Sequence, residues 1–117
     1  MSEIQIWHNP RCSKSREAMK LLEESGVEAD VVKYLETDLD EDTIKALLLK
    51  LDIDAVDLMR TKEDIFKELK LDQVGDEGVL IRAMVRFPKL IERPIVIKGD
   101  RAVIGRPPQK VIEFVKG

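Results

Sequence analysis

Cysteine and histidine are nearly missing from this sequence, which contains one of each among its 117 residues. A single cysteine excludes an internal disulfide, and one cysteine with one histidine falls short of the ligand count of an ordinary zinc site. No stretch reaches the roughly 18 apolar residues that a membrane-spanning helix needs, and the opening residues, MSEIQIWHNP, lack the pattern of a secretory signal. We therefore expect a cytoplasmic protein that holds no metal and spans no membrane.

A dominant charge is missing as well. Lys and Arg number 20 against 23 Asp and Glu, which gives a net charge of -3 at pH 7. This balance repels the phosphates of nucleic acid and of anionic membranes, so neither is an expected partner, and any anion site must be local. With 44% hydrophobic and 37% charged residues, the chain has the composition of a globular protein of about one domain. We expect a monomer, since nothing in the apolar pattern indicates an interface.

The first third of the chain predicts a strand, a helix and a second strand. Apolar and polar residues alternate over residues 3–7, which is typical of a half-buried strand. Apolar residues then recur at helical spacing from Ser15 to Leu22, and Gly26 is a suitable position for the helix to end. Residues 28–35 predict the second strand. Two strands joined by a helix over so short a length are typical of a parallel pair with a crossover helix.

The middle of the chain predicts helices, and the end returns to strands. Asp38 and Thr61 have the spacing of helix N-caps ahead of apolar stripes. Gly99 lies at the centre of a predicted hairpin, and prolines suit the first turn of a final helix. The predicted elements are helices within 38–51, 61–69 and 76–87, strands within 93–105 and a helix within 107–117. The order β-α-β, helices, β-β-α therefore predicts a small α/β domain interrupted by helices.

Both scarce side chains lie in the stretch WHNPRCSKSREA, residues 7–18. Cys12 follows the first predicted strand and precedes the first helix, and in an open α/β sheet ligands bind at that edge. Unpaired backbone N–H groups and the helix dipole favour a thiolate there, and the positive potential of His8, Arg11, Lys14 and Arg16 acts in the same sense. A lone cysteine can instead be a buried apolar residue. Since the neighbours of Cys12 are polar and charged, we interpret it as a reactive thiol.

The sequence leaves the roles of three neighbouring residues open. His8 either tunes the thiol or is a structural histidine. Asn9 and Ser15 are either turn and cap residues or parts of the site, and for Asn9 the turn role is the better interpretation. Ser15 occupies the second position of a C-x-x-C motif, so a resolving cysteine is missing. Thiol chemistry at Cys12 must therefore be completed by an external thiol.

An anion at Cys12 needs cationic groups from elsewhere in the chain. Most arginines are solvated surface residues, so context has to single out the candidates. Arg60 precedes the predicted cap Thr61, whereas Arg93 and Arg106 each precede a proline at the start of an element. A proline restricts the backbone beside it, which favours a fixed guanidinium that binds an oxyanion through two hydrogen bonds. These three arginines are the candidates for oxyanion binding.

Four segments, in this order, resemble the glutaredoxin-coupled arsenate reductases of the ArsC type, within the ArsC/Spx group of thioredoxin-like proteins. The segments are HNPRCSKSR at 8–16, LMRTKE at 58–63, ERPIVI at 92–97 and IGRP at 104–107. The similarity extends over nearly the whole chain. It implies one thioredoxin-like α/β domain, residues 1–117, with a mixed sheet and an inserted helical subdomain at approximately 36–91. It also implies a cis peptide bond between Arg93 and Pro94.

The resemblance implies a role for each candidate residue. Cys12 would be the nucleophile that attacks arsenate, and His8 would favour its thiolate. The substrate-binding residues would be Arg60, Arg93, Arg106 and Ser15, the last as a hydrogen-bond donor of the loop. No cofactor would be bound, because glutathione and the protein glutaredoxin would act as external reductants and release arsenite.

Two other functions stay open at this stage. One is a general glutathione-dependent thiol reductase of the same fold. The other is a non-catalytic module that binds a protein partner through the charged residues 36–76, although a solvated face is the usual explanation of such charges. A redox regulator of the Spx type, which binds RNA polymerase, is disfavoured because Ser15 stands in place of its second cysteine.

Overall fold

The computed structural model describes residues 3–116, which form two compact units. One unit combines the segment up to Thr37 with the segment from Arg93 onward, and the other is Asp38–Glu92. The expectation of a single domain with a helical insertion at about 36–91 stays a prediction. No helix within residues 3–116 is long and apolar enough to cross a membrane.

A four-stranded mixed sheet forms the centre of the first unit. The strands are β1 (Ile4–Trp7), β2 (Asp30–Val32), β3 (Ile95–Lys98) and β4 (Arg101–Ile104), in the order β2-β1-β3-β4. β1 is parallel to β2 and antiparallel to β3, and β3 is antiparallel to β4. Within this register, Ile6 of β1 lies opposite Val31 on one side and Val96 on the other. The prediction of a mixed α/β sheet is confirmed.

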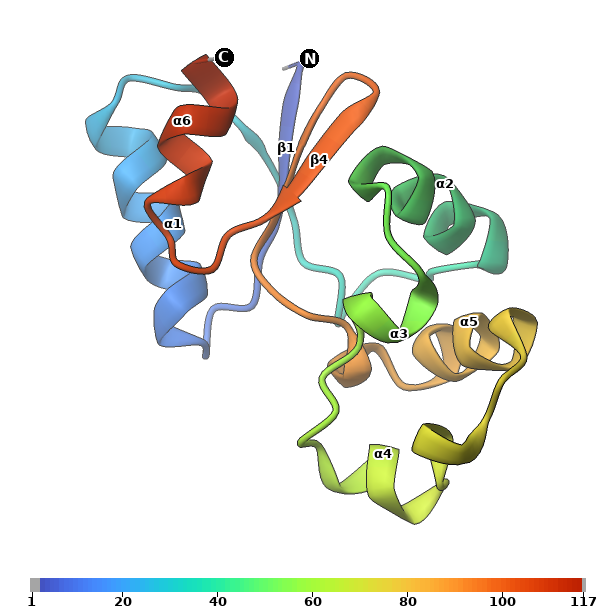
Figure 1. The fold of residues 1–117 in the computed structure, drawn as a ribbon. Helices are drawn as coiled ribbons and strands as arrows, with labels where there is room; N and C mark the ends of the chain where they lie inside the picture. Colours follow the sequence, from blue (N-terminus) through green and yellow to red (C-terminus); the bar gives the residue numbers. More distant parts are fainter. Residues whose placement is uncertain (1–2, 117) are drawn as a thin grey trace. The chain divides into compact units, whose positions relative to one another are not determined.

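Two helices, α1 (Ser13–Glu24) and α6 (Lys110–Lys116), lie side by side on one face of this sheet (Figure 1). Ala18 and Leu22 of α1 are four residues apart and therefore point to the same side of the helix. They pack with residues of β1, β3 and α6 in a core that consists of Ile6, Ala18, Leu22, Val96, Val111 and Val115. This core holds the N-terminus of α1 beside the end of β1, because both elements bury apolar surface against each other.

The C-terminus of α1 ends as the sequence predicts. Gly26 has φ +72°, in the left-handed region that glycine adopts without steric cost. Its N–H donates to the carbonyl of Glu23, and the N–H of Val27 donates to the carbonyl of Leu22, both at 3.0 Å. These two bonds form a Schellman motif, which satisfies carbonyls that the helix leaves unpaired.

Helices make up most of the second unit. They are α2 (Glu41–Leu51), α3 (Ala55–Leu58), α4 (Asp64–Glu68) and α5 (Glu77–Arg86), with short 3-10 turns at Leu71–Gln73 and Pro88–Leu90. α5 packs against α2 and α3, and the apolar stripe of α2 is buried at Ile44, Leu47 and Leu48. α3 was not among the predicted elements, because four residues are too few to show a helical period.

Three helix starts differ from the predictions. Asp40, not Asp38, is the N-cap of α2: its Oδ1 accepts hydrogen bonds from the N–H of Thr43 at 2.8 Å and from its hydroxyl at 2.7 Å. Thr61 caps no helix, because α4 begins at Asp64 with Glu63 at the N-cap. The last helix begins at Lys110, so the two prolines before it lie in the preceding turn rather than in its first turn.

Candidate active site

Cys12 is the N-cap residue of α1, at the end of a tight loop that follows β1. Its backbone is extended, with φ -95° and ψ 123°, and its N–H donates to the carbonyl of Asn9 at 3.0 Å. The side-chain oxygen of Asn9 accepts a hydrogen bond from the N–H of Arg11, also at 3.0 Å. Asn9 therefore has the turn role that its residue type favours. The loop places the thiol at the positive end of the helix dipole, with the residue 9% exposed.

Several groups near the Cys12 sulfur act on its pKa. Burial raises the pKa of this thiol. The backbone N–H of Ser15, the Arg93 guanidinium and the backbone N–H of Lys14 lower it, and Arg93 does so through both a hydrogen bond and its charge. The net result is a pKa below the ordinary value of 9.0. Cys12 makes no capping hydrogen bond of conventional geometry, so the two N–H groups act on the thiolate through weaker contacts. A thiolate is the nucleophilic form of cysteine.

Two arginines lie beside this sulfur. The Nη2 of Arg106 is 3.9 Å from the Cys12 Sγ, and its Nε donates to the backbone carbonyl of Arg93 at 2.8 Å. The Arg93 guanidinium also interacts with the thiol, while its buried Nε and Nη1 have no hydrogen-bond partner among residues 3–116. Buried N–H donors without partners are costly, so these two groups are available to bind an anion.

The backbone that carries the two arginines is tightly packed. The N–H of Gly105 donates to the carbonyl of Pro94 at 2.8 Å, which joins the residue before Arg106 to the residue after Arg93. A Cβ on Gly105 would come within 2.9 Å of both Pro94 Cγ and Val111 Cγ1, so only glycine fits there. The Arg93–Pro94 bond is cis, as the resemblance implied. The Arg106–Pro107 bond is cis as well, which the sequence did not predict.

His8 lies four residues before Cys12 and Ser15 three residues after it, and their side chains contact each other. The Nδ1 of His8 is 2.6 Å from the Ser15 Oγ, which also accepts a hydrogen bond from the N–H of Asn9 at 3.0 Å. Burial lowers the pKa of His8 below 6.5, and the charges of Lys33 and Arg16 lower it further. His8 is therefore mostly uncharged at pH 7, so it does not add the positive charge beside the thiol that the sequence predicts.

Ser15, which the resemblance implies to be a hydrogen-bond donor to the substrate, is fully buried. Its hydroxyl is engaged with the His8 ring and the Asn9 N–H, so it holds the loop together from within. The structure places this side chain in the loop interior rather than on the surface where a substrate would meet it. Only its backbone N–H acts on the Cys12 thiol.

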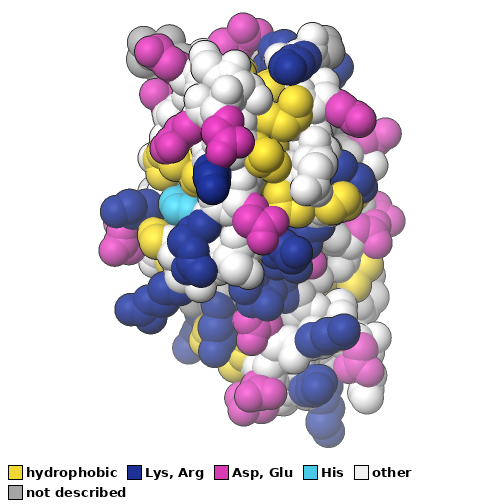
Figure 2. Space-filling model, turned by 90° about the vertical axis from the view of Figure 1, so that its left-hand side faces the viewer, with side chains coloured by type: hydrophobic (Ala, Val, Ile, Leu, Met, Phe, Trp, Pro, Cys, Tyr) yellow, Lys and Arg dark blue, Asp and Glu magenta, His cyan; other side chains and the backbone are white. Residues whose placement is uncertain are grey.

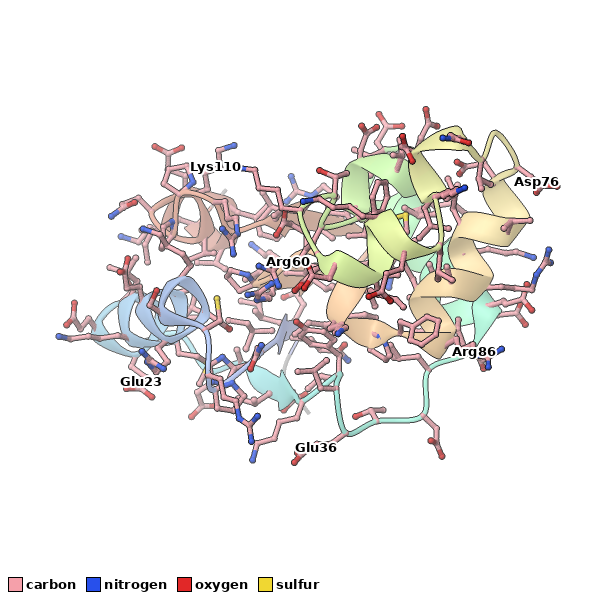
Figure 3. The ribbon with its side chains drawn as sticks, turned by 90° about the horizontal axis from the view of Figure 1, so that it is seen from below. Glu23, Glu36, Arg60, Asp76, Arg86 and Lys110 are labelled. Atoms are coloured by element: carbon pink, nitrogen blue, oxygen red, sulfur yellow. The ribbon has the colours of Figure 1, made fainter. Side chains whose placement is uncertain are left out.

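Arg60 belongs to the second unit, where it follows α3 (labelled in Figure 3). Its guanidinium forms a short ion pair with Glu63, and its Nε is 3.7 Å from a carboxylate oxygen of Glu92. Its N–H donates to the carbonyl of Leu90 at 2.7 Å. The charge of Arg60 is thus balanced by two carboxylates, which no local sequence pattern predicts. Of the three predicted arginines, the structure brings Arg93 and Arg106 to Cys12 within the first unit.

The fold and the site define a thioredoxin-like protein with a single cysteine at the N-terminus of its first helix. The chain belongs to the ArsC family, whose family model matches residues 7–114. It is 54% identical over 115 residues to the uncharacterized protein YfgD of Escherichia coli strain K12, covering 97% of each chain. It is 49% identical over 114 residues to an arsenate reductase of Neisseria meningitidis serogroup A, covering 95% of this chain and 97% of the relative.

A solved structure is similar to this one over the same length. The arsenate reductase from Vibrio cholerae has a TM-score of 0.90 and 46% sequence identity, covering 94% of this chain and 95% of that chain. The resemblance inferred from the four sequence segments is thereby confirmed, and so is the thioredoxin-like fold class.

Proposed function

We propose that this protein is an arsenate reductase in which Cys12 is the nucleophile. One observation carries the proposal: the sulfur of Cys12, with a lowered pKa, lies beside the guanidinium groups of Arg93 and Arg106. A thiolate next to fixed donors for an oxyanion is the arrangement that attack on a tetrahedral oxyacid needs. Relatives named arsenate reductase at 44% and 49% identity support the choice of arsenate among the possible anions.

In the first step, the Cys12 sulfur forms a bond to As(V) of arsenate and one arsenate oxygen leaves as hydroxide or water. Arg93 and Arg106 hold the remaining oxygens and stabilise the negative charge that develops on them. Removal of one such preorganised donor commonly lowers the rate on the order of 100-fold or more. The role of Arg60 as a third arsenate ligand stays a prediction that rests on its sequence motif.

External thiols complete the reaction, because the chain has no second cysteine. We propose glutathione and glutaredoxin as these reductants. In sum, one arsenic acid and two thiols give one arsenous acid, one disulfide and one water. The two thiols supply the two electrons that convert As(V) to As(III), and Cys12 returns to the thiolate. Such chemistry needs a reducing compartment, so we place the protein in the cytoplasm.

A coupled assay tests this function. Oxidation of NADPH is followed with glutathione, glutathione reductase and glutaredoxin, in the presence and absence of arsenate. We expect arsenate-dependent oxidation by the wild-type protein, and none by Cys12→Ser. A fully active Cys12→Ser variant would show that Cys12 is not the nucleophile.

The same thiolate could serve a general glutathione-dependent thiol reductase, and the assay separates the two functions. A general reductase would oxidise NADPH with a mixed disulfide as substrate and would show no response to arsenate. A non-catalytic binding module would show neither activity, and its partner binding would be unaffected by Cys12→Ser.

A further inference from the structure

A surface pocket of about 510 Å³ lies in the second unit, and the chemistry proposed for Cys12 involves none of its residues. Its lining comes from α2, the loop after α2, α3 and α5. α5 packs against both α2 and α3, all three labelled in Figure 1, so these helices hold the lining together. The pocket lies mostly within the charged segment 36–76, for which the sequence left a protein-binding role open.

Leu49 of α2 lines this pocket and is 83% exposed. The other exposed large apolar side chains of residues 3–116 are between 42% and 44% exposed. Leu48 and Ile81 also line the pocket and are buried, so the lining combines buried and exposed apolar side chains. A single exposed leucine is ordinary on a protein surface, and its surroundings decide whether it marks a binding site.

The surroundings of Leu49 are acidic. The charged residues that line the pocket are one lysine and four acids, namely Lys45, Asp52, Asp54, Asp57 and Glu77. None of the four carboxylates forms an ion pair within residues 3–116. Asp57 accepts the N–H of Asp54 at 3.4 Å, and Glu77 accepts the N–H of Ala55 at 3.1 Å. Neither bond supplies a positive side chain, so the negative charge of the pocket stays unbalanced.

Elsewhere on the surface the two signs of charge are mixed. On the face shown in Figure 2, dark-blue Lys and Arg side chains lie among magenta Asp and Glu side chains. Two exposed pairs show the same mixing: Lys20 lies 4.0 Å from Glu24, and Arg82 lies 3.9 Å from Glu41. The pocket therefore differs from such regions in its local excess of negative charge beside exposed apolar surface.

We propose that this pocket binds a basic amphipathic segment of another protein. An apolar side chain of the partner contacts Leu49 and removes its surface from water, while flanking lysine or arginine side chains pair with the carboxylates of the pocket. Charge complementarity selects this occupant. Nucleic acid and anionic membranes are repelled, and a second copy of the chain carries the same net charge of -3. Such binding goes beyond the proposed function and does not involve Cys12.

A synthetic amphipathic helix of leucine and lysine is the probe, because it presents an apolar face flanked by cations. Its binding to the full chain is measured by fluorescence anisotropy of a labelled peptide. A second peptide, in which glutamate replaces every lysine, keeps the apolar face and reverses the charge. We expect the lysine peptide to bind at least tenfold more tightly than the glutamate peptide.

Leu49→Gln tests the apolar contact. We expect it to raise the Kd of the lysine peptide about tenfold, which corresponds to about 1.4 kcal/mol of binding free energy. An exposed helical position tolerates this change, so the fold should be unaffected. Leu69→Gln is the matched control, because Leu69 is an exposed leucine of the same unit that does not line this pocket. We expect it to change the Kd by less than about twofold.

A double variant, Asp52→Asn with Asp54→Asn, tests the acidic side chains. Asp52 has φ 57°, in the left-handed region that asparagine also adopts, and Asp54 is the N-cap of α3, where asparagine serves equally well. The fold should therefore be preserved, which urea unfolding checks. We expect the Kd to rise about fivefold at low salt, and less than about twofold at about 1 M salt, where the Debye length is about 3 Å.

Glu68→Gln with Asp72→Asn is the matched control for charge, because it neutralises two exposed acids of the same unit that do not line the pocket. Equal effects of the two double variants would overturn the proposal, since they would reflect net charge alone. Equal binding of the lysine and glutamate peptides would overturn it, as would an unchanged Kd in Leu49→Gln. Self-association that Leu49→Gln abolishes would assign the pocket to a second copy of the chain and overturn the basic partner.

Discussion

The imidazole Nδ1 of His8 and the hydroxyl of Ser15 form a buried hydrogen bond of 2.6 Å across the loop that presents Cys12. The bond joins the residue after β1 to the first turn of α1, and the same hydroxyl accepts the N–H of Asn9. The Ser15 side chain therefore links His8 and the backbone of Asn9 to the first turn of α1. The reactive thiol is held in place by a network that does not itself touch the sulfur.

Ser15→Ala should destabilise the protein through this network. The substitution leaves the His8 Nδ1 and the Asn9 N–H without their partner in a buried place, which costs about 1–3 kcal/mol of unfolding free energy. Urea unfolding measures the loss. Ser13→Ala is the control, because Ser13 is exposed and lies two residues earlier in the same helix. It should change the unfolding free energy by less than about 0.5 kcal/mol. Equal effects of the two variants would contradict the role of the hydroxyl.

Acidification should destabilise the fold through His8. Its folded pKa lies below 6.5, mainly because of burial, so the unfolded chain binds the proton more readily. The contribution of His8 to the unfolding free energy is therefore complete above pH 6.5 and is lost as the pH falls through the folded pKa. Urea unfolding between about pH 5 and pH 7, above the range of most carboxyls, measures this slope. His8→Gln should have a flatter profile, and a profile identical to that of the wild type would contradict the assignment.

Arg93→Gln should raise the pKa of Cys12. Its guanidinium lowers this pKa through a hydrogen bond and through its charge, and glutamine removes the charge while it keeps a donor. The pH dependence of alkylation by iodoacetamide reports the thiolate. We expect a midpoint below pH 9.0 in the wild type and a higher one in the variant. Lys20→Gln, which removes a distant charge of α1, is the control. A midpoint that does not move in Arg93→Gln would show that the backbone N–H groups alone set the pKa.

Gly105→Ala should disturb the arginine pair. The added Cβ would lie 2.9 Å from atoms of Pro94 and Val111, so the backbone that carries Arg106 has to shift. Overpacking of this kind costs about 1–3 kcal/mol, and the displaced guanidinium should also raise the KM for arsenate. Gly75→Ala is the matched control, because a Cβ there meets no atom within 4 Å. Wild-type stability and kinetics in Gly105→Ala would show that the close approach does not position Arg106.

Local patterns explain why so much of the fold could be predicted. Alternation over β1, the helical period of α1 and the glycine at position 26 each act within a few residues, so they are visible in the chain without its neighbours. The mixed sheet and the order of elements follow from such patterns. The exact helix caps did not, since Asp38 and Asp40 both have a suitable side chain and only the structure shows that Asp40 accepts the N–H of Thr43.

Part of the candidate site could likewise be predicted from local sequence patterns, and part could not. The sequence by itself determined that one thiol stands at a helix start among basic residues, and that a resolving thiol must come from outside, because residue types and spacing decide both. Only the tertiary structure decided that Arg93 and Arg106 reach Cys12, that Arg60 is paired with Glu63, and that His8 is neutral. Charge pairing and burial depend on which residues meet across the fold, and that information is absent from any short stretch of the chain.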